Sequence, residues 1–149
     1  MAPDRIEREI LIEAPQELVW SVITEPEHVS GWFSDTARIE LRPGGAMTLV
    51  WEGADGHTEH GRVEKVEPPH RFSFRWIRGS AEVRDGNSTL VEFSLSTEDG
   101  GTLLRVVESG FTRLDWPEED RARDAEEHRQ GWEHELDQLR EYCLRAADR

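Results

Sequence analysis

Glu108 is the polar residue with the clearest potential for chemistry. The alternation of apolar side chains around it predicts that its carboxylate lies on the same sheet face as Phe93 and Val106. A carboxylate on an apolar face must be paired with a cation, be protonated or contact a ligand. The alternative is a position at the rim of the sheet, where strands end and water enters. A role as acid or base toward a bound molecule and a role as a solvated rim residue therefore both stay open.

The histidines do not form an obvious metal site. His57 and His60 flank Glu59, but residues three apart on a strand point to opposite faces, so we expect no metal there. His128 and His134 are six apart in a helical segment and lie on different faces. We interpret both as solvated or packing residues.

Nucleophilic and cofactor chemistry find little support. The sequence has no Gly-x-Ser-x-Gly elbow and no phosphate-binding glycine loop followed by Lys-Ser or Lys-Thr. Cys143, the single cysteine, falls on an apolar helical stripe, where a thiol behaves as a small hydrophobic group. Lys65 is the only lysine, so Schiff-base chemistry would depend on it alone. We predict no cofactor, and enzymatic activity is left uncertain, with its absence favoured.

Tryptophan supplies six of the twelve aromatic residues. An indole offers a wide apolar wall and one N–H donor, which suits the lining of a ligand cavity. Plain core packing is the alternative, and we favour it for Trp20. For Trp32, Trp51, Trp76 and Trp132 the two interpretations are balanced.

The elements that position these side chains follow a simple order. Alternation over residues 7–13 predicts a strand, and an apolar stripe over 15–23 predicts a short helix. Thr24 and Glu27 have capping-box spacing, which predicts a second short helix that ends at Gly31. From residue 37 to 109, short strands alternate with turns, which favours an antiparallel sheet over a parallel one. The predicted turns lie at 43–45, 53–56, 68–69, 85–87 and 99–101.

Two of these turns predict strand register. A two-residue turn at 99–100 and another at 68–69 would each create one apolar face. At the second turn, an indole would cover the backbone that a glycine leaves bare. The predicted pairs are Leu95–Leu104, Phe93–Val106 and Val91–Glu108 for the first turn, and Val63–Phe74 and Gly61–Trp76 for the second.

A long C-terminal helix is predicted from about residue 116 to 147, a stretch with one proline in its first turn. Its apolar residues form one stripe, consisting of Trp132, Leu136, Leu139, Cys143 and Ala146. Gly131 interrupts this helix at a cost in helix propensity, so we expect its backbone to approach the sheet or a ligand closely.

The composition limits the class of protein. The chain has 149 residues and a net charge of −14, from 18 basic and 32 acidic residues. We expect one domain over 1–149, and the negative charge argues against a nucleic-acid partner. No segment has the apolar length of a membrane span or the pattern of a signal peptide, so no membrane insertion is expected. With a single cysteine, a cytoplasmic location fits best.

The order of strand, two short helices, antiparallel sheet and closing helix is the helix-grip order. The chain resembles the activator of heat-shock protein 90 ATPase-like family, in the START and polyketide-cyclase superfamily, over nearly its whole length. The resemblance rests on Ala14-Pro15, Val19-Trp20, Thr24-Glu25-Pro26, Gly31-Trp32-Phe33, Pro43-Gly44-Gly45, Gly61 through Glu67-Pro68-Pro69, Gly101-Thr102-Leu103, Glu108-Ser109-Gly110-Phe111, Gly131-Trp132, Leu136 and Leu139.

The resemblance implies an α+β helix-grip fold, in which a curved antiparallel sheet wraps around the long helix and encloses a hydrophobic cavity. Its implied function is binding of a small hydrophobic or amphipathic molecule between the sheet and the C-terminal helix. Polyketide cyclase-like chemistry, a chaperone-associated adaptor role and a homodimer stay open. The eukaryotic co-chaperone that names the family has an additional N-terminal domain, whereas the first strand here begins near Met1, which weakens the adaptor interpretation. The candidate ligand-binding residues are Trp32, Phe33, Trp51, Phe74, Trp76, Phe93, Glu108, Phe111, Trp132 and Leu136.

Overall fold

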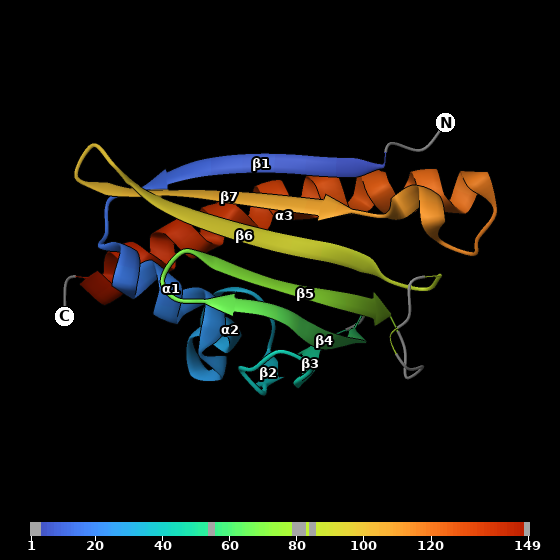
Figure 1. The fold of residues 1–149 in the computed structure, drawn as a ribbon, viewed down its shortest axis with the longest axis horizontal. Coiled ribbons are helices and arrows are strands. Elements are labelled where there is room, and N and C mark those ends of the chain that lie inside the picture. Colours follow the sequence, from blue (N-terminus) through green and yellow to red (C-terminus); the bar gives the residue numbers. More distant parts are fainter. Residues whose placement is uncertain (1–3, 54–55, 79–82, 84–85, 148–149) are drawn as a thin grey trace.

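The fold is a curved antiparallel sheet that packs against one long helix (Figure 1). A computed structural model describes residues 4–53, 56–78, 83 and 86–147. The predicted turns at 53–56 and 85–87 each include residues outside this described part. The sheet has the strand order β1-β7-β6-β5-β4-β3-β2. The strands are β1 (Arg5–Ile12), β2 (Thr36–Ile39), β3 (Ala46–Trp51), β4 (His57–Glu67), β5 (Arg71–Arg78), β6 (Thr89–Glu98) and β7 (Gly101–Ser109).

The helices lie where the sequence predicts them. Two short helices, α1 (Gln16–Thr24) and α2 (Pro26–Trp32), follow β1, and a short 3-10 helix, η1 (Phe111–Arg113), precedes α3 (Glu118–Ala147). Figure 1 shows α3 running along one face of the sheet, with its C-terminal end near α1 and α2. This arrangement confirms the predicted α+β helix-grip fold.

Register in the β6–β7 hairpin matches the prediction. Phe93 pairs with Val106, and Val91 pairs with Glu108. The turn residues Asp99 and Gly100 have φ angles of 49° and 81°, which is the backbone of a two-residue turn suited to the twist of a hairpin. The two-residue side-chain period then places Glu108 on the apolar face.

Register in the β4–β5 hairpin is also as predicted away from the turn, where Gly61 pairs with Trp76. The turn itself is one residue longer than predicted, since Glu67 pairs with Arg71. A bulge between Val63 and Lys65 absorbs the extra residue and restores the register. A β-carbon on Gly61 would lie 2.6 Å from a backbone oxygen of β5, so only glycine fits there.

The predicted capping of α2 is wrong. Thr24 belongs to α1, and its hydroxyl donates to the carbonyl of Trp20 at 2.7 Å, so it does not cap the next helix. Instead, α2 begins with Pro26, which tolerates the first helical position because it has no N–H to satisfy. Gly31 lies inside α2 rather than after it, where a β-carbon would be 2.5 Å from Cε2 of Tyr142.

The apolar core fills most of the space between the sheet and the C-terminal half of α3. Phe72, Phe74 and Phe93 of the sheet belong to one cluster with Leu136 and Leu139 of α3. Cys143 lies in the same cluster and is fully buried, and burial raises the pKa of its thiol to about 12. This burial confirms the predicted position of Cys143 on the buried stripe of α3.

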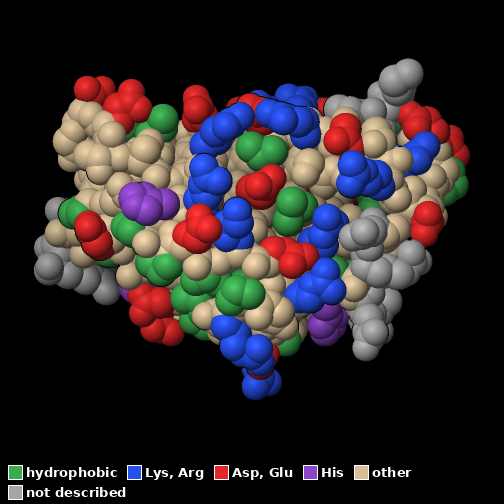
Figure 2. Space-filling view, viewed as in Figure 1, with side chains coloured by type: hydrophobic (Ala, Val, Ile, Leu, Met, Phe, Trp, Pro, Cys, Tyr) green, Lys and Arg blue, Asp and Glu red, His purple; other side chains and the backbone are tan. Residues whose placement is uncertain are grey.

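The opposite face of the sheet is polar. Figure 2 shows this outer face, where arginine and carboxylate side chains are interspersed with a few apolar ones. Arg105 contacts Glu7 across neighbouring strands at 2.7 Å, and Arg75 lies 3.4 Å from Glu64. Among the described residues, no helix is long and apolar enough to cross a membrane.

Candidate functional site

On three strands, the inward-facing rows of apolar side chains end in residues with polar groups, at the same end of the sheet. On β5, β6 and β7, the apolar rows end in Trp76, Thr89 and Glu108, respectively. Trp76 pairs with Thr89, and Glu108 pairs with Val91 two residues further along β6. An indole, a hydroxyl and a carboxylate therefore face α3 together.

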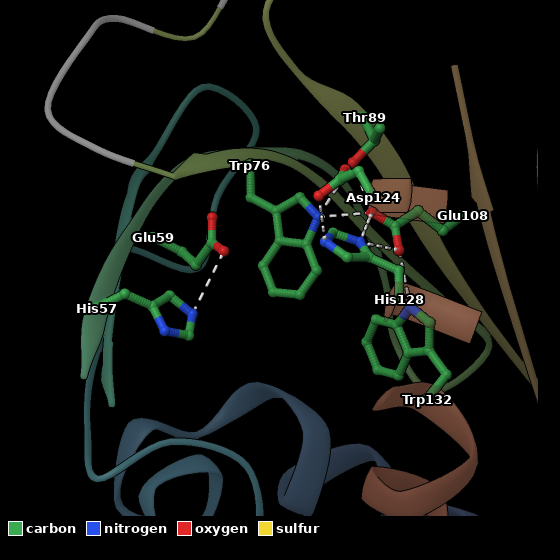
Figure 3. A network of polar contacts seen from close by, with 8 residues as sticks. All are labelled: His57, Glu59, Trp76, Thr89, Glu108, Asp124, His128 and Trp132. Carbon is green, nitrogen blue, oxygen red and sulfur yellow. Dashed lines mark hydrogen bonds and ion pairs between the residues drawn. The ribbon is translucent and has the colours of Figure 1, made fainter. Parts of the chain in front are cut away.

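Four side chains donate hydrogen bonds to the Glu108 carboxylate (Figure 3). Trp76 Nε1 and Thr89 Oγ1 donate to Oε2, at 2.8 and 2.5 Å. Trp132 Nε1 donates to Oε1 at 2.9 Å. His128 Nδ1 lies between the two oxygens, at 2.8 and 2.9 Å. Two turns of α3 thus close over the carboxylate, which is 0% exposed.

Glu108 and His128 each stabilise the ionised form of the other. Burial raises the pKa of Glu108, but the charge of His128 and the hydrogen bonds outweigh this effect and hold the pKa below its usual value. Burial lowers the pKa of His128, but the charge of Glu108, with smaller contributions from Asp124 and Glu59, raises it to about 9. His128 Nε2 also faces Asp124 Oδ1, at 3.4 Å. The imidazolium therefore lies between two carboxylates.

These contacts revise two interpretations of the sequence. Glu108 is not a solvated rim residue, because α3 covers the end of its strand. His128 is not a solvated or merely packing residue, because it is the charge partner of Glu108. The sequence offered one clue to this pairing: His128 is four residues before Trp132 and continues the buried stripe of α3 by one turn.

Two adjoining clefts open beside this network. The first has a volume of about 440 Å³ and lies between the β5 and β6 ends and the N-terminal half of α3. The second has a volume of about 180 Å³ and lies between β3, β4 and the middle of α3. The two clefts are continuous with each other, because four residues line both of them: Glu59, Trp76, Glu127 and His128. The first cleft is also lined by Ile77, Asn87, Thr89, Leu114, Trp116, Asp120, Arg123 and Asp124.

Aromatic rings form two walls of the second cleft. Phe33 stacks on Trp132 and on Trp76, with ring centroids 5.5 and 5.8 Å apart. Trp51 stands nearly perpendicular to Phe33 at 5.2 Å, and His57 stacks on Trp51 at 4.8 Å. These five rings all line the cleft.

The indole N–H groups of these walls are used inside the protein. Trp51 Nε1 donates to the carbonyl of Phe33 at 2.8 Å, and Trp76 and Trp132 donate to Glu108. Each indole is thereby fixed in orientation. What the tryptophans present to the second cleft is therefore ring surface rather than N–H donors.

Carboxylates from two elements complete the clefts. Glu59 of β4 is 6% exposed and lies 3.5 Å from His57 Nε2 (Figure 3). Glu127 and Glu135 of α3 line the second cleft on either side of Gly131. Burial raises the pKa of Glu135 to about 7. A partly buried carboxylate without a compensating charge is costly, which makes Glu135 receptive to a positively charged neighbour.

Gly131 corrects a further expectation. Apart from its own stretch of helix, no described atom lies within 4 Å of the place where its β-carbon would be, so the helix backbone does not approach the sheet there. The glycine instead faces the open second cleft, which it lines. Its missing side chain leaves room in the cleft rather than a tight contact with the sheet.

The predicted ligand-binding residues separate into three groups. Four of them line the second cleft, namely Phe33, Trp51, Trp76 and Trp132. Glu108 lies beneath the clefts in the hydrogen-bond network, and Phe111 lies in a smaller apolar cluster with its ring 5.7 Å from that of His128. The others, Trp32, Phe74, Phe93 and Leu136, lie in the main core.

Several cleft residues were not predicted from the sequence, among them Trp116, Glu59, Glu127 and Glu135. Trp116 is 40% exposed at the edge of the first cleft, which is unusual for so large an apolar side chain. Within the described part of the chain, no group of three or more His, Cys, Asp or Glu side chains is arranged to hold a metal ion.

The curved antiparallel sheet and the long closing helix define a helix-grip protein. The chain belongs to the Activator of Hsp90 ATPase homolog 1-like protein family, whose sequence model matches residues 13–143. This match confirms the resemblance found in the sequence. Among curated proteins, no sequence matches this chain.

Similar solved structures share the fold over most of the chain. A Mesorhizobium loti protein is 22% identical, with a TM-score of 0.78, and the match covers 95% of this chain and 97% of that protein. CalU16 from Micromonospora echinospora is 26% identical, with a TM-score of 0.67 over 93% of this chain and 75% of CalU16. DynU16, from the dynemicin biosynthetic locus, is 23% identical, with a TM-score of 0.73 over 97% of this chain and 49% of DynU16. Family and fold together support ligand binding in general.

Proposed function

We propose that this protein binds a small hydrophobic or amphipathic molecule in the two adjoining clefts between the sheet and α3. The observation that carries the proposal is the aromatic wall of the second cleft, formed by Phe33, Trp51, Trp76 and Trp132. Large apolar rings around an open space suit the binding of an apolar body. The proposed position is the end of the interface near Glu108, because the other end is filled by the core.

The contacts of Glu108 favour binding over acid–base chemistry at this residue. Both of its oxygens accept hydrogen bonds from the protein, and its charge is compensated by His128. His128 in turn has one nitrogen on Glu108 and the other facing Asp124. A general acid or base must reach the proton that it transfers, and these two residues are directed toward each other. Their proposed role is to hold Trp76 and Trp132 in place.

A chaperone adaptor role has less support. The large apolar side chains that are exposed among the described residues are Leu11, Leu41, Trp116 and Leu144. They lie on four separate segments, whereas a docking site for a protein partner usually presents a contiguous apolar patch. Trp116 also lines the first cleft, where a bound molecule would cover it.

The test uses the neutral fluorescent probe N-phenyl-1-naphthylamine with two matched variants. Trp51 and Trp20 are both half-buried, but only Trp51 lines a cleft, whereas Trp20 packs against Phe72. We expect saturable binding by the wild type, at least fivefold weaker binding by Trp51→Leu, roughly what losing one stacking partner costs, and unchanged binding by Trp20→Leu. Absence of saturable binding, or equal loss in both variants, contradicts the proposal.

A further inference from the structure

We propose that the ligand carries a positive charge, as an amine or quaternary ammonium group attached to an apolar body, and that this charge lies in the second cleft. This inference rests on the proposed function. The cationic group would contact the half-buried rings of Phe33 and Trp51 and lie near Glu127 and Glu135. Recognition would thus combine cation–π attraction with two carboxylates.

The first argument concerns hydrogen-bond donors. The three indole N–H groups of the cleft are already bonded to the protein, to the carbonyl of Phe33 or to Glu108. An anionic group entering the cleft would therefore find ring faces, and the face of an aromatic ring carries partial negative charge. The same surface attracts a cation.

The second argument concerns charge. The histidines in the second cleft already face carboxylates: His57 faces Glu59, and His128 faces Glu108 and Asp124. The remaining charged lining groups of this cleft, Glu127 and Glu135, are both acidic. The cleft therefore has an excess of negative charge without a ligand.

The third argument concerns spacing along α3. Glu127, Gly131 and Glu135 are four residues apart in succession, so they share one face of the helix. The two carboxylates flank the position where Gly131 leaves open space. Among the described residues, neither Glu127 nor Glu135 forms a hydrogen bond or an ion pair with another side chain, so both are available to a cationic group between them.

The neighbouring first cleft has room for the rest of the molecule. Its volume is about 440 Å³, and its lining includes Ile77, Leu114 and the exposed ring of Trp116. The two clefts meet at Trp76 and His128. An amphipathic amine could therefore place its charge in the second cleft and its apolar body along the first.

The test compares two probes of the same shape, 4-(trimethylammonio)benzyl alcohol and its neutral isostere 4-tert-butylbenzyl alcohol, by isothermal titration calorimetry. At pH 8 the Glu135 carboxyl, with its pKa raised by burial to about 7, is ionised. We expect the ammonium probe to bind at least about tenfold more tightly than the neutral probe, as for a desolvated cation–π site.

Glu135→Gln is the informative variant, and Glu133→Gln is its control, because Glu133 is exposed on the same helix and lines neither cleft. Glu135→Gln should reduce the preference for the ammonium probe over the neutral probe severalfold, whereas Glu133→Gln should leave this preference unchanged. Equal or tighter binding of the neutral probe overturns the inference but leaves the proposed function standing. Failure of both probes to bind overturns the inference together with the proposed function.

Discussion

Phe74 of β5 and Leu139 of α3 lie in a closed apolar core, and both are at most 1% exposed. Trp76, the next inward-facing residue of β5, and His128, in an earlier part of α3, instead line open clefts. The elements run through both regions without a break, and only the residue types change along the inward-facing rows. A closed core and an open cleft can therefore be built from the same strand and the same helix.

The two regions differ in how they fix their side chains. The core holds its side chains by close packing of apolar surface, which is not directional. The cleft region fixes the rings of Trp76 and Trp132 through directional hydrogen bonds to a single buried carboxylate, Glu108. Both rings are also buried and stack on Phe33, so the hydrogen bonds add a fixed orientation to rings that are already packed.

The largest predicted effect is that of Glu108→Gln. The amide nitrogen of glutamine would face N–H donors, and His128 would lose its charge partner, so we expect the free energy of unfolding to fall by about 3–5 kcal/mol, as when one member of a buried ion pair is removed. Urea unfolding at pH 7 measures this change. Glu92→Gln is the control, because Glu92 is exposed on β6, and we expect a change within about 0.5 kcal/mol. A similar small change for Glu108→Gln would show that the carboxylate does not organise the cleft region.

The next effect is a pH dependence of stability that only the cleft region provides. The pKa of His128 is raised from 6.5 to about 9 in the folded state, so its stabilising contribution is complete below pH 6.5 and is lost as the pH rises through 9. This rise in pKa corresponds to about 3 kcal/mol of stability over the interval.

Urea unfolding of the wild type and of His128→Gln between pH 6.5 and 9 measures this contribution. Burial also raises the pKa values of Glu135 and Cys143, but these two groups are present in both proteins, so the comparison removes their contribution. We expect the wild type to lose stability more steeply than the variant. Parallel curves would mean that His128 is not held as an imidazolium.

The sequence was sufficient for the features that depend on local periodicity. The two-residue period placed Glu108 on the face of Phe93 and Val106, and the turn at Asp99-Gly100 fixed the register of the hairpin. The apolar stripe of α3 likewise identified the helix face that meets the sheet. Each of these inferences uses one element or one short connection.

The pairing of Glu108 with His128 could not be obtained in this way. It depends on which turn of α3 lies opposite the end of β7, and the period of a helix gives its buried face but not its position along a strand. The same limit applies to the aromatic residues, because Phe93 in the core and Trp76 at the cleft occupy equivalent inward positions. Only the closing contacts of α3 distinguish a filled position from an open one.

The smallest predicted effect concerns Gly131→Ala and has the opposite sign to the others. Because the added β-carbon would meet no described atom within 4 Å outside its own stretch of helix, the gain in helix propensity should raise the free energy of unfolding by about 0.5–1 kcal/mol. Gly31→Ala is the matched control, since Gly31 is also helical but its β-carbon would lie 2.5 Å from the ring of Tyr142, so this variant should be destabilised. Urea unfolding measures both changes.

The larger Gly131→Leu should also weaken binding of N-phenyl-1-naphthylamine, because its side chain would occupy the second cleft. If Gly131→Ala proved less stable than the wild type, α3 would lie against its neighbours at this turn. The second cleft would then not be open at Gly131, and the distinction between a filled core and an open cleft would not hold there.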